Sequence, residues 1–453
     1  MFERKIAWEV LDREAIEKFA KEYIHFIGNA KTEREVVEYL IEIARKNGFV
    51  ELDDMENLKP GDKVFSVFKN KTVIFAVIGK KSLKEGLRII AAHADAPRLD
   101  PKIVPLMEDK DSQLALLNMG YYGGIVAYQW VNIPLELRGI VVTKNGSKRI
   151  RIKNLVIADL LPHLSRKKFE ERKASDTVKG EELKILLANI PTRDENKKKS
   201  WKKTVLKILS EKYGIDEEDL ISADLEVVPA LEPIEVGLDS SMIAAYGQDD
   251  RVCIYTAFRA LIDSGVAEYT KVLWIVDREE IGSETNTSAQ SEFFKFLVSK
   301  LLEKSGGYSE ITLRETLLNS KAISADVGAV VNPSFKSAVY DLSNAARLGS
   351  GVLLEKYLNA AGKGGENEAH AEFVGWVRRI LDENNVPWQP ALLVSKTERV
   401  GGGGTISKFM ARLGMDVIDI GVGLLGMHSP FEIASKADIY AAYRAYKVFY
   451  EAR

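Results

Sequence analysis

Cysteine is almost absent from this chain, and neither sign of charge is in excess. One cysteine, Cys253, stands among 453 residues, so the chain forms no internal disulfide and nothing in it requires an oxidising compartment. Lys and Arg together number 64, against 66 for Asp and Glu, which argues against nucleic acid or an anionic membrane as a partner. We therefore expect a cytoplasmic protein.

Long apolar runs are missing as well. The run from Val73 to Gly79 is typical of the longest, whereas a membrane-spanning helix needs about 20 apolar residues. The first 26 residues spread their charges at helical spacing and lack the apolar core of a signal peptide, which predicts an amphipathic helix. With 46% hydrophobic and 29% charged residues, the composition is that of a globular protein, and the length suggests about two or three domains.

Several enzyme signatures are also lacking. Residues 421–426 match the dinucleotide pattern Gly-x-Gly-x-x-Gly, but Met427, His428 and Pro430 follow where a helix should open. The glycines at 401–404 lack the Lys-Ser/Thr ending of a phosphate-binding loop. Neither Gly-x-Ser-x-Gly nor His-Glu-x-x-His occurs, so serine hydrolase and single-zinc peptidase mechanisms have no support.

Strand-like and helix-like segments alternate in two parts of the chain, which predicts an α/β fold. The first part has apolar strand patterns at 63–69, 72–79 and 87–94. The second part alternates to the C-terminal end, where a last helix is expected from Phe431. Its other predicted elements are a helix from Arg251, strand 271–277, helix 288–306, strand 321–327, helix 370–385 and strands 390–396 and 416–423.

The region between these two parts differs in composition. Residues 135–160 indicate a β-hairpin around the turn dipeptide Asn145-Gly146. Two charged segments, 165–183 and 192–203, indicate exposed helix and loop. The sequence therefore predicts a β-rich domain inserted into a discontinuous α/β domain. The predicted bounds are 101–236 for the inserted domain and 1–100 with 237–453 for the discontinuous domain.

Polar groups follow the ends of several apolar segments. Because the carboxyl ends of parallel strands form the ligand crevice of an open α/β sheet, we expect these groups to converge. Each alone would more often be a structural histidine, a helix cap or a turn, so the prediction rests on their coincidence. The groups are His93, Asp95, Asp249, Asp250, Glu279, Glu280, Asp326 and His428.

Imidazoles and carboxylates are the ligands that Zn²⁺, Co²⁺ or Mn²⁺ take. Two histidines and three acids suit two ions that share one acid, as in two-metal hydrolases. The neighbours Glu279 and Glu280 leave a strand end in different directions, so one can bind metal while the other acts as general base. His93 and Asp95 lie on the same side of an extended segment, so Asp95 can accept the second ring N–H of His93.

The phrases HADAP, GQDDRVC, DREEIGS, SADVG and GMHSPFE occur in this order, and with them the chain resembles the aspartyl aminopeptidase family, which includes the vacuolar aminopeptidase I type. Phrases of the inserted region, such as NLVIADLLPHL and ILLANIP, match the family too. The resemblance implies a zinc-aminopeptidase-like three-layer α/β catalytic domain with an inserted β-rich dimerisation domain. It also implies a homo-oligomer, a tetrahedral dodecamer built from dimers.

The resemblance implies a ligand role for five residues by motif position. His93 would bind one zinc ion and His428 the other, Asp249 would bridge the two, and Asp326 and Glu280 would complete the two shells.

The same resemblance implies roles for four more residues. Glu279 would be the base that activates the water bridging the ions, and Asp95 would orient the first histidine ligand. His163 falls where the family has a histidine that reaches a neighbouring subunit's active site. Thr405 matches a residue that lines the substrate site.

The chain departs from the family in its specificity elements. Residues 123–137 stand where relatives carry a Trp-Phe-Asp-Arg-Asp-Leu stretch. Where acid-specific relatives supply a lysine to the substrate carboxylate, residues 343–347 place an alanine. Arg347, Lys396 and Arg399 are the substitute cations to consider. We expect a neutral or broad preference over strict removal of Asp or Glu, since a buried substrate carboxylate needs a cation.

The favoured interpretation is a metallo-aminopeptidase that removes N-terminal residues from peptides through a metal-bridging hydroxide. It would use two divalent ions per subunit, zinc first, with cobalt or manganese as alternatives. The other interpretations are a different two-metal amide hydrolase, such as a deacylase or carboxypeptidase, or a non-catalytic peptide-binding or shell-forming relative. The presence of Glu279 together with every expected ligand argues against an inactive protein.

Overall fold

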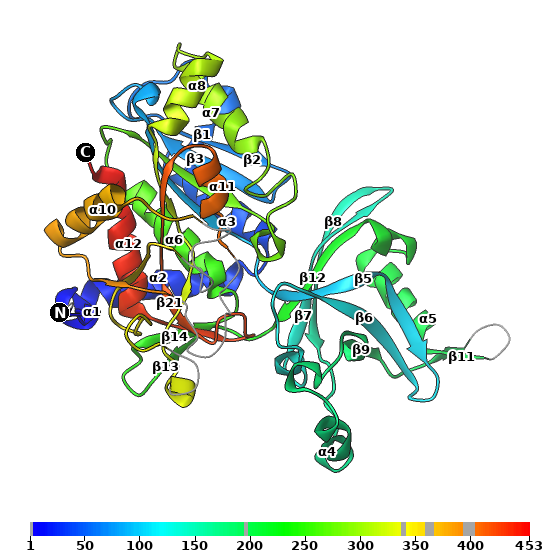
Figure 1. Ribbon diagram of the computed structural model, residues 1–453. Coiled ribbons are helices and arrows are strands. Elements are labelled where there is room, and N and C mark those ends of the chain that lie inside the picture. Colours follow the sequence, from blue (N-terminus) through cyan, green and yellow to red (C-terminus); the bar gives the residue numbers. More distant parts are fainter. Residues whose placement is uncertain (1–2, 194–197, 337–340, 358–366, 393–403) are drawn as a thin grey trace. The chain divides into compact units, whose positions relative to one another are not determined.

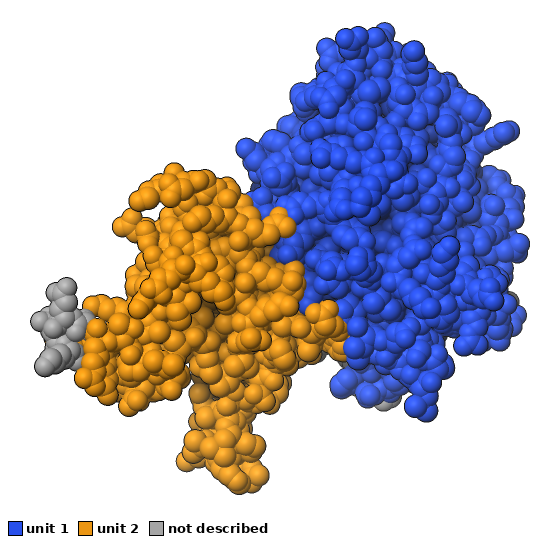
Figure 2. Space-filling view, turned by 180° about the vertical axis from the view of Figure 1, so that it is seen from behind, with its two compact units in different colours: residues 1–95, 233–427, 432–453 blue, residues 96–232, 428–431 orange. Residues whose placement is uncertain are grey.

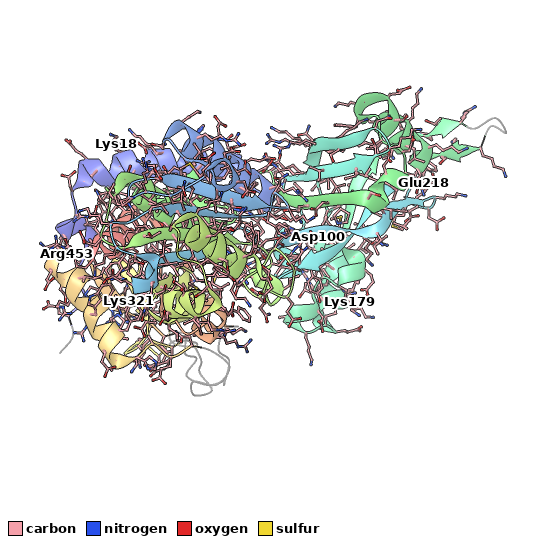
Figure 3. All side chains as sticks on the ribbon, turned by 90° about the horizontal axis from the view of Figure 1, so that it is seen from above. Lys18, Asp100, Lys179, Glu218, Lys321 and Arg453 are labelled. Carbon is pink, nitrogen blue, oxygen red and sulfur yellow. The ribbon has the colours of Figure 1, made fainter. Side chains whose placement is uncertain are left out.

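The computed structural model describes residues 3–193, 198–336, 341–357, 367–392 and 404–453 (Figure 1). They form two compact units, shown in blue and orange in Figure 2. Charged side chains project from each unit (Figure 3). Unit 1 comprises residues 1–95, 233–427 and 432–453, and unit 2 comprises residues 96–232 and 428–431.

Two helices stand where the sequence predicts a single amphipathic N-terminal helix. Helix α1 (Ala7–Val10) ends before α2 (Arg13–Asn29), because the Asp12 carboxylate accepts a hydrogen bond from the Ala15 N–H and caps the second helix. Helix α3 (Glu33–Lys46) follows and begins with a Thr32 cap of the same kind.

The largest sheet of the described residues has nine strands and forms the centre of unit 1. Its central strands β15, β4, β16 and β20 are parallel, so their carboxyl ends lie at one edge. All positions of β3, β4 and β15 are buried, which explains their unbroken apolar sequences. In spatial order the strands are β1 (Val50–Glu51), β2 (Lys63–Phe68), β3 (Thr72–Val77), β15 (Thr270–Val276), β4 (Leu87–His93), β16 (Lys321–Ser324), β20 (Asp416–Gly421), β18 (Val352–Glu355) and β19 (Trp388–Pro390).

Helices cover both faces of this sheet, so unit 1 has three layers. Alternate residues of β15 enter two different cores: Leu273 packs with α2, α3 and the helices α6, α10 and α12, while Trp274 packs with α7, α8 and α11. The α/β class predicted from the sequence is confirmed. The bounds of these helices are α6 (Gln248–Asp263), α7 (Phe293–Lys304), α8 (Glu310–Leu318), α10 (Ala371–Glu383), α11 (Ser407–Arg412) and α12 (Lys436–Glu451).

A second sheet of unit 1 corrects the prediction for the C-terminal end. Residues 432–435 form strand β22, which pairs with β14 and β21, and the last helix begins only at Lys436. The predicted helix start at Phe431 was wrong because these cross-strand partners override the local helical pattern. Of the predicted strand 390–396, β19 ends at Pro390, and residues from 393 lie outside the described ranges. The strands of this sheet are β13 (Ile234–Val236), β14 (Met242–Ala245), β22 (Glu432–Ser435), β21 (Gly423–Leu425) and β17 (Gly328–Ala329).

Unit 2 is built on a six-stranded sheet. The predicted hairpin is present, with Lys144 and Asn145 in the turn and Gly146 at a φ of 109° at the start of the returning strand. Two helices, α4 (Pro162–Glu170) and α5 (Trp201–Ile208), belong to the unit, and a wider helical turn, Leu209–Tyr213, continues α5. The strands are β8 (Gly146–Leu155), β7 (Leu135–Thr143), β12 (Ala223–Pro229), β5 (Arg98–Asp109), β6 (Leu114–Tyr122) and β9 (Lys184–Ala188), with β10 (Thr192–Arg193) and β11 (Lys199–Ser200) as a separate pair.

In the part of the chain that the structure describes, no helix has the length and apolar character needed to cross a bilayer.

Candidate metal centre

Three neighbouring parallel strands bring polar residues to one edge of the nine-stranded sheet. His93 is the last residue of β4 and lies opposite Val276, the last residue of β15. The turn with Glu279 and Glu280 follows β15, and Asp326 follows β16 on the other side of β4. The sheet topology therefore supplies the convergence expected from the sequence.

His93, Asp249 and Asp326 form a cluster whose ligand atoms all lie within 4.8 Å of one another; His93 and Asp249 are buried and Asp326 is partly exposed. The His93 Nε2 atom lies 3.3 Å from Asp249 Oδ1 and 3.9 Å from Asp326 Oδ1. One imidazole and two carboxylates are a donor set that suits zinc. All three residues belong to unit 1.

Asp95 fixes the orientation of both the histidine and the glutamate turn. The His93 Nδ1 atom lies 3.0 Å from the main-chain oxygen of Asp95 and 3.4 Å from its Oδ1, so Nε2 faces the cluster. The two carboxylate oxygens of Asp95 accept hydrogen bonds from the N–H groups of Glu279 (3.1 Å) and Glu280 (3.2 Å). A buried acid in this place holds a ligand and the neighbouring turn in one geometry.

The adjacent glutamates have different neighbours. Arg278 adopts a left-handed conformation at φ 66°, and a short 3₁₀ turn, Glu279–Ile281, follows it. The Oε2 atom of Glu279 lies 4.0 Å from His93 Nε2. A carboxylate oxygen of Glu280 lies within 4.8 Å of one from Asp249. The Glu279 carboxylate thus lies beside His93, whereas the Glu280 carboxylate lies beside Asp249.

Asp249 lies in the first turn of α6 and is held by a residue that sequence reasoning missed. The Asp249 N–H donates to Glu432 Oε2 at 3.1 Å, and Gln248 Nε2 donates to the Glu432 main-chain oxygen at 2.6 Å. Glu432 lies on β22, where a helix was predicted, and a carboxylate that binds a distant N–H leaves no spacing pattern in the sequence. The next peptide bond, between Asp249 and Asp250, is cis, and Asp250 Oδ2 accepts a hydrogen bond from the His93 N–H at 3.3 Å.

The electrostatics of the cluster indicate a surplus of negative charge. Burial disfavours the charged imidazolium of His93, yet hydrogen bonds to Asp249 and Asp95 outweigh this and hold its pKa well above the usual range. Burial, and next the charge of Asp250, raises the pKa of Asp326 well above its ordinary value. Burial likewise raises the pKa of Asp250. A divalent cation would compensate these crowded acids, so the residues fit a metal.

Comparisons with known proteins identify the family. A family model described as aminopeptidase I zinc metalloprotease (M18) matches residues 26–450. A probable M18 family aminopeptidase 1 from Thermotoga maritima is 47% identical over 458 residues, which are 99% of each chain. This chain belongs to the M18 aminopeptidase family. The predicted family and the predicted class, a zinc-dependent aminopeptidase, are confirmed.

Solved structures agree with this placement. The crystal structure of an M18 family aminopeptidase from Thermotoga maritima matches with a TM-score of 0.94 and 46% identity, covering 100% of both chains. A dodecamer of mApe1 from S. cerevisiae matches with a TM-score of 0.74 over 96% of this chain and 97% of that one. At 20% identity the yeast protein shows the shared fold alone.

His428 of this M18 chain lies directly after Met427, in the short stretch 428–431 that groups with unit 2. It has a φ of 66°, and its Nδ1 atom lies 2.9 Å from the Gly124 main-chain oxygen. A histidine that binds metal through Nε2 commonly makes this hydrogen bond through Nδ1.

Thr405 lies beside the carboxyl end of β16. Its hydroxyl donates to Asp419 Oδ1 at 2.5 Å and accepts from Ser324 Oγ at 3.2 Å. Burial raises the pKa of Asp419 to about 6, although hydrogen bonds from these hydroxyls oppose the shift. Thr405 is thus held at the same edge of the sheet that carries Asp326.

The remaining specificity candidates lie elsewhere. The Arg347 guanidinium donates to the main-chain oxygens of Leu342 (2.9 Å) and Ala345 (2.7 Å), so it ties together its own loop. Its backbone is clamped by the Gln389 side chain. His163 is exposed on α4 of unit 2. Lys396 and Arg399 lie outside the described residues.

Proposed function

We propose that this M18 aminopeptidase uses two zinc ions, one held by His93, Asp249 and Asp326 and the other by Asp249, Glu280 and His428. The observation that carries the proposal is the cluster of His93, Asp249 and Asp326, with a carboxylate oxygen of Glu280 within 4.8 Å of one from Asp249. The order and type of these residues along the chain, together with the hydrogen bond of His428 Nδ1, support the second set.

In this proposal the bound ions supply Lewis-acid activation of a water molecule and of the scissile carbonyl. Glu279 takes the proton of the attacking water and passes it to the leaving amine. The distance of 4.0 Å between Glu279 Oε2 and His93 Nε2 supports this role, because a base must lie close to the metal ligands. Asp95 is a positioning residue for His93 and for the Glu279 turn.

Metal content tests the ligand assignment. Protein purified without chelator is expected to hold two zinc ions per chain by elemental mass spectrometry. His428→Ala is expected to hold one, because the first set lacks His428. His370→Ala, at an exposed histidine directly before α10, should keep both ions. Two ions in the His428→Ala protein would refute the second set.

A substrate panel tests the reaction. Aminoacyl anilides, their N-acetylated analogues and C-terminal carboxypeptidase substrates are compared after zinc addition. Cleavage confined to free amino termini is expected for an aminopeptidase. Hydrolysis of the acetylated compounds or of C-terminal residues would favour the deacylase or carboxypeptidase alternative, and no hydrolysis of any would favour a binding protein.

For assembly, we propose a tetrahedral dodecamer built from dimers, in which His163 reaches the active site of a neighbouring chain. The support is the dodecamer of the yeast relative and the exposed place of His163 on α4. Mixing and reassembling inactive Glu279→Gln and His163→Ala proteins should restore activity. A fully active monomer by sedimentation analysis, without complementation, would contradict this proposal.

For specificity, we propose neutral or broad N-terminal residues over strict Asp or Glu. A substrate carboxylate needs a cation, and Arg347 is engaged by its own loop carbonyls. The ratio kcat/KM is compared for aspartyl, glutamyl, leucyl, methionyl and lysyl substrates. An acidic preference of about 100-fold, or about 2.7 kcal/mol, would overturn the proposal.

A further inference from the structure

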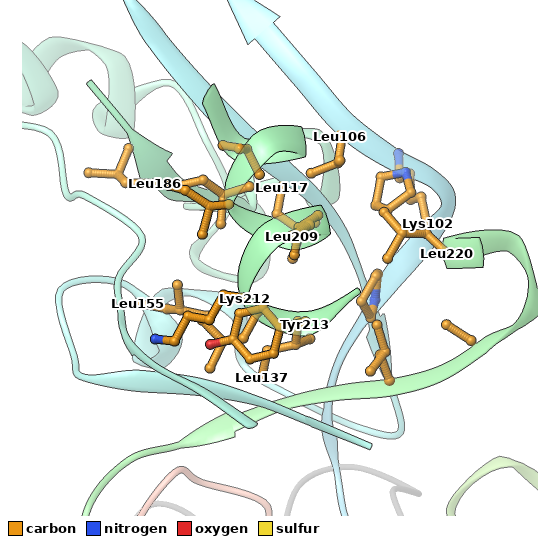
Figure 4. Close-up of a pocket in the computed structure, with 18 of the residues that line it drawn as sticks. Lys102, Leu106, Leu117, Leu137, Leu155, Leu186, Leu209, Lys212, Tyr213 and Leu220 are labelled. Atoms are coloured by element: carbon orange, nitrogen blue, oxygen red, sulfur yellow. The ribbon is translucent and has the colours of Figure 1, made fainter. Parts of the chain in front are cut away.

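Unit 2 contains a cavity of about 340 Å³ that is independent of the metal centre (Figure 4). Strands β5 to β9 and β12 supply one side, and α5 with the turn Leu209–Tyr213 supplies the other. The volume lies near the lower end of the range of about 300–1,000 Å³ for small-ligand pockets. Every lining residue belongs to unit 2.

The wall of the cavity is mostly aliphatic, and Tyr213 and Asn154 also line it. Leu106, Leu117 and Leu137 project from the sheet, and Leu209 lies on the helical side (Figure 4). Ile103, on the same lining, leaves 76% of its surface exposed, so apolar area remains at the mouth. Hydrocarbon that enters such a cavity leaves water without losing hydrogen bonds.

Three lysines line the same cavity, one from each of three segments. Lys102 comes from β5, Lys153 from β8 and Lys212 from the turn after α5, and all three are exposed. Some other lysines of the unit are paired with acids, as Lys168 with Glu182 and Lys202 with Glu217. The three lysines of the cavity have no carboxylate within ion-pair distance among the residues that the structure describes. Lys212 Nζ lies 5.4 Å from the centre of the Tyr213 ring, a cation–π contact that leaves its charge in place. The cavity therefore combines an apolar interior with positive charge that no carboxylate of the described residues neutralises.

We propose that this cavity binds an unbranched alkyl carboxylate, with the chain against the leucines and the carboxylate toward the lysines. A peptide is a poorer match, because its amides would lose water against an aliphatic wall that offers few polar partners. An alkyl amine is excluded by the sign of the lysine charges. The cavity volume suits one short chain and is too small for a two-chain lipid.

Calorimetric titration of the full-length oligomer with a homologous series from hexanoate to dodecanoate tests the apolar part. Each added methylene should tighten binding roughly fourfold until the cavity is filled. 1-Decanol should bind more weakly than decanoate, and decylamine more weakly still. No binding by the assembled protein, or equal affinity for decanoate and decylamine, would overturn the proposal.

Replacing the three lysines tests the charged part. The triple variant Lys102→Gln, Lys153→Gln, Lys212→Gln should bind decanoate about five- to tenfold more weakly and decanol unchanged, since each exposed ion pair contributes modestly. The matched control replaces Lys110, Lys144 and Lys173, which are exposed in the same unit but do not line the cavity. Equal losses in both triple variants would contradict the assignment.

Partial filling of the cavity gives a readout that a general folding defect would not produce. Ala223, on β12, lines the wall. Ala223→Phe should shorten the chain length at which affinity stops rising, while leaving hydrolysis of aminoacyl anilides unchanged. An unchanged chain-length limit in a folded Ala223→Phe protein would place the ligand elsewhere and refute the proposed site.

Discussion

The two units both bury charged side chains, but they balance them differently. In unit 2, buried Glu136 lies 2.7 Å from Arg138 and 2.9 Å from Arg151, so opposite charges meet. In unit 1, His93 faces Asp249 and Asp326 among further acids, so negative charge is in surplus. Matched buried charges hold a fold together, whereas a surplus of one sign marks a place where a counter-ion binds.

The surplus of negative charge belongs to the candidate metal site and is not a general property of unit 1. Away from the sheet edge, unit 1 also buries a matched pair, Lys71 with Glu33 at 3.2 Å. Removing a carboxylate from a matched pair should therefore cost stability, while removing one from the surplus should cost metal binding or catalysis.

The largest expected effect is that of Glu279→Gln. A neutral amide cannot take the proton of the attacking water, so kcat should fall about 10²- to 10⁴-fold. Zinc content should stay unchanged, because Glu279 is not a ligand in the proposed sets. Steady-state kinetics and elemental analysis on the same preparation measure both. Near-normal turnover in the zinc-loaded variant would remove Glu279 from the mechanism.

The second effect concerns the matched network of unit 2. Glu136→Gln removes the negative charge that lies 2.7 Å from the buried Arg138 guanidinium, so the free energy of unfolding should fall by about 3 kcal/mol. Chemical denaturation measures the loss, and zinc content per folded chain should be unaffected. Glu218→Gln, at an exposed acid of the same unit, is the control and should change stability by less than about 0.5 kcal/mol. Equal effects of the two variants would show that the buried match contributes nothing.

The third effect is that of Asp95→Asn. The amide keeps the shape of the side chain but has one acceptor oxygen where Asp95 has two, and it lacks the charge that favours a well-oriented His93. Zinc affinity should fall about 10- to 100-fold, as for other residues that orient a ligand. Competition with a chromogenic chelator measures it. A zinc affinity equal to that of the wild type would show that Asp95 does not position His93 for metal binding.

Local sequence predicts much of this arrangement and fails where distant partners decide. Strand β4, which ends at His93, could be predicted because it is buried on both faces and has an almost continuous apolar sequence. Strand β16, which precedes Asp326, is buried at three of its four positions. Strand β22 could not be predicted, because its four residues become a strand only through pairing with β14 and β21. Glu432 lies on this strand, so its contact with Asp249 could not be predicted either. The cavity of unit 2 has no sequence signature because its lining residues come from six strands and a helix.

The smallest expected effect concerns a buried charge, that of Lys271, which donates hydrogen bonds to neutral oxygens. Lys271, on β15, is fully buried, and its ammonium donates to neutral oxygens of Ser264 and Gly265. Burial lowers its pKa to about 8, below the value of about 10.4 in an unfolded chain. Between these values the unfolded chain holds the proton that the folded protein has released, so stability should rise with pH over this window.

Lys271→Met removes this titration and isolates it from the other groups. The difference in the free energy of unfolding between the wild type and Lys271→Met should move in favour of the wild type by on the order of 1–2 kcal/mol from about pH 8 to about pH 10. Urea denaturation at several pH values measures the difference. Below about pH 7, one pH unit under the folded-state pKa of about 8, Lys271 is protonated in both states and the difference should be constant. A difference that does not change with pH would contradict this prediction. It would mean that the neutral oxygens stabilise the buried ammonium of Lys271 as fully as a carboxylate does. The distinction between matched and unmatched buried charges would then not apply to this lysine.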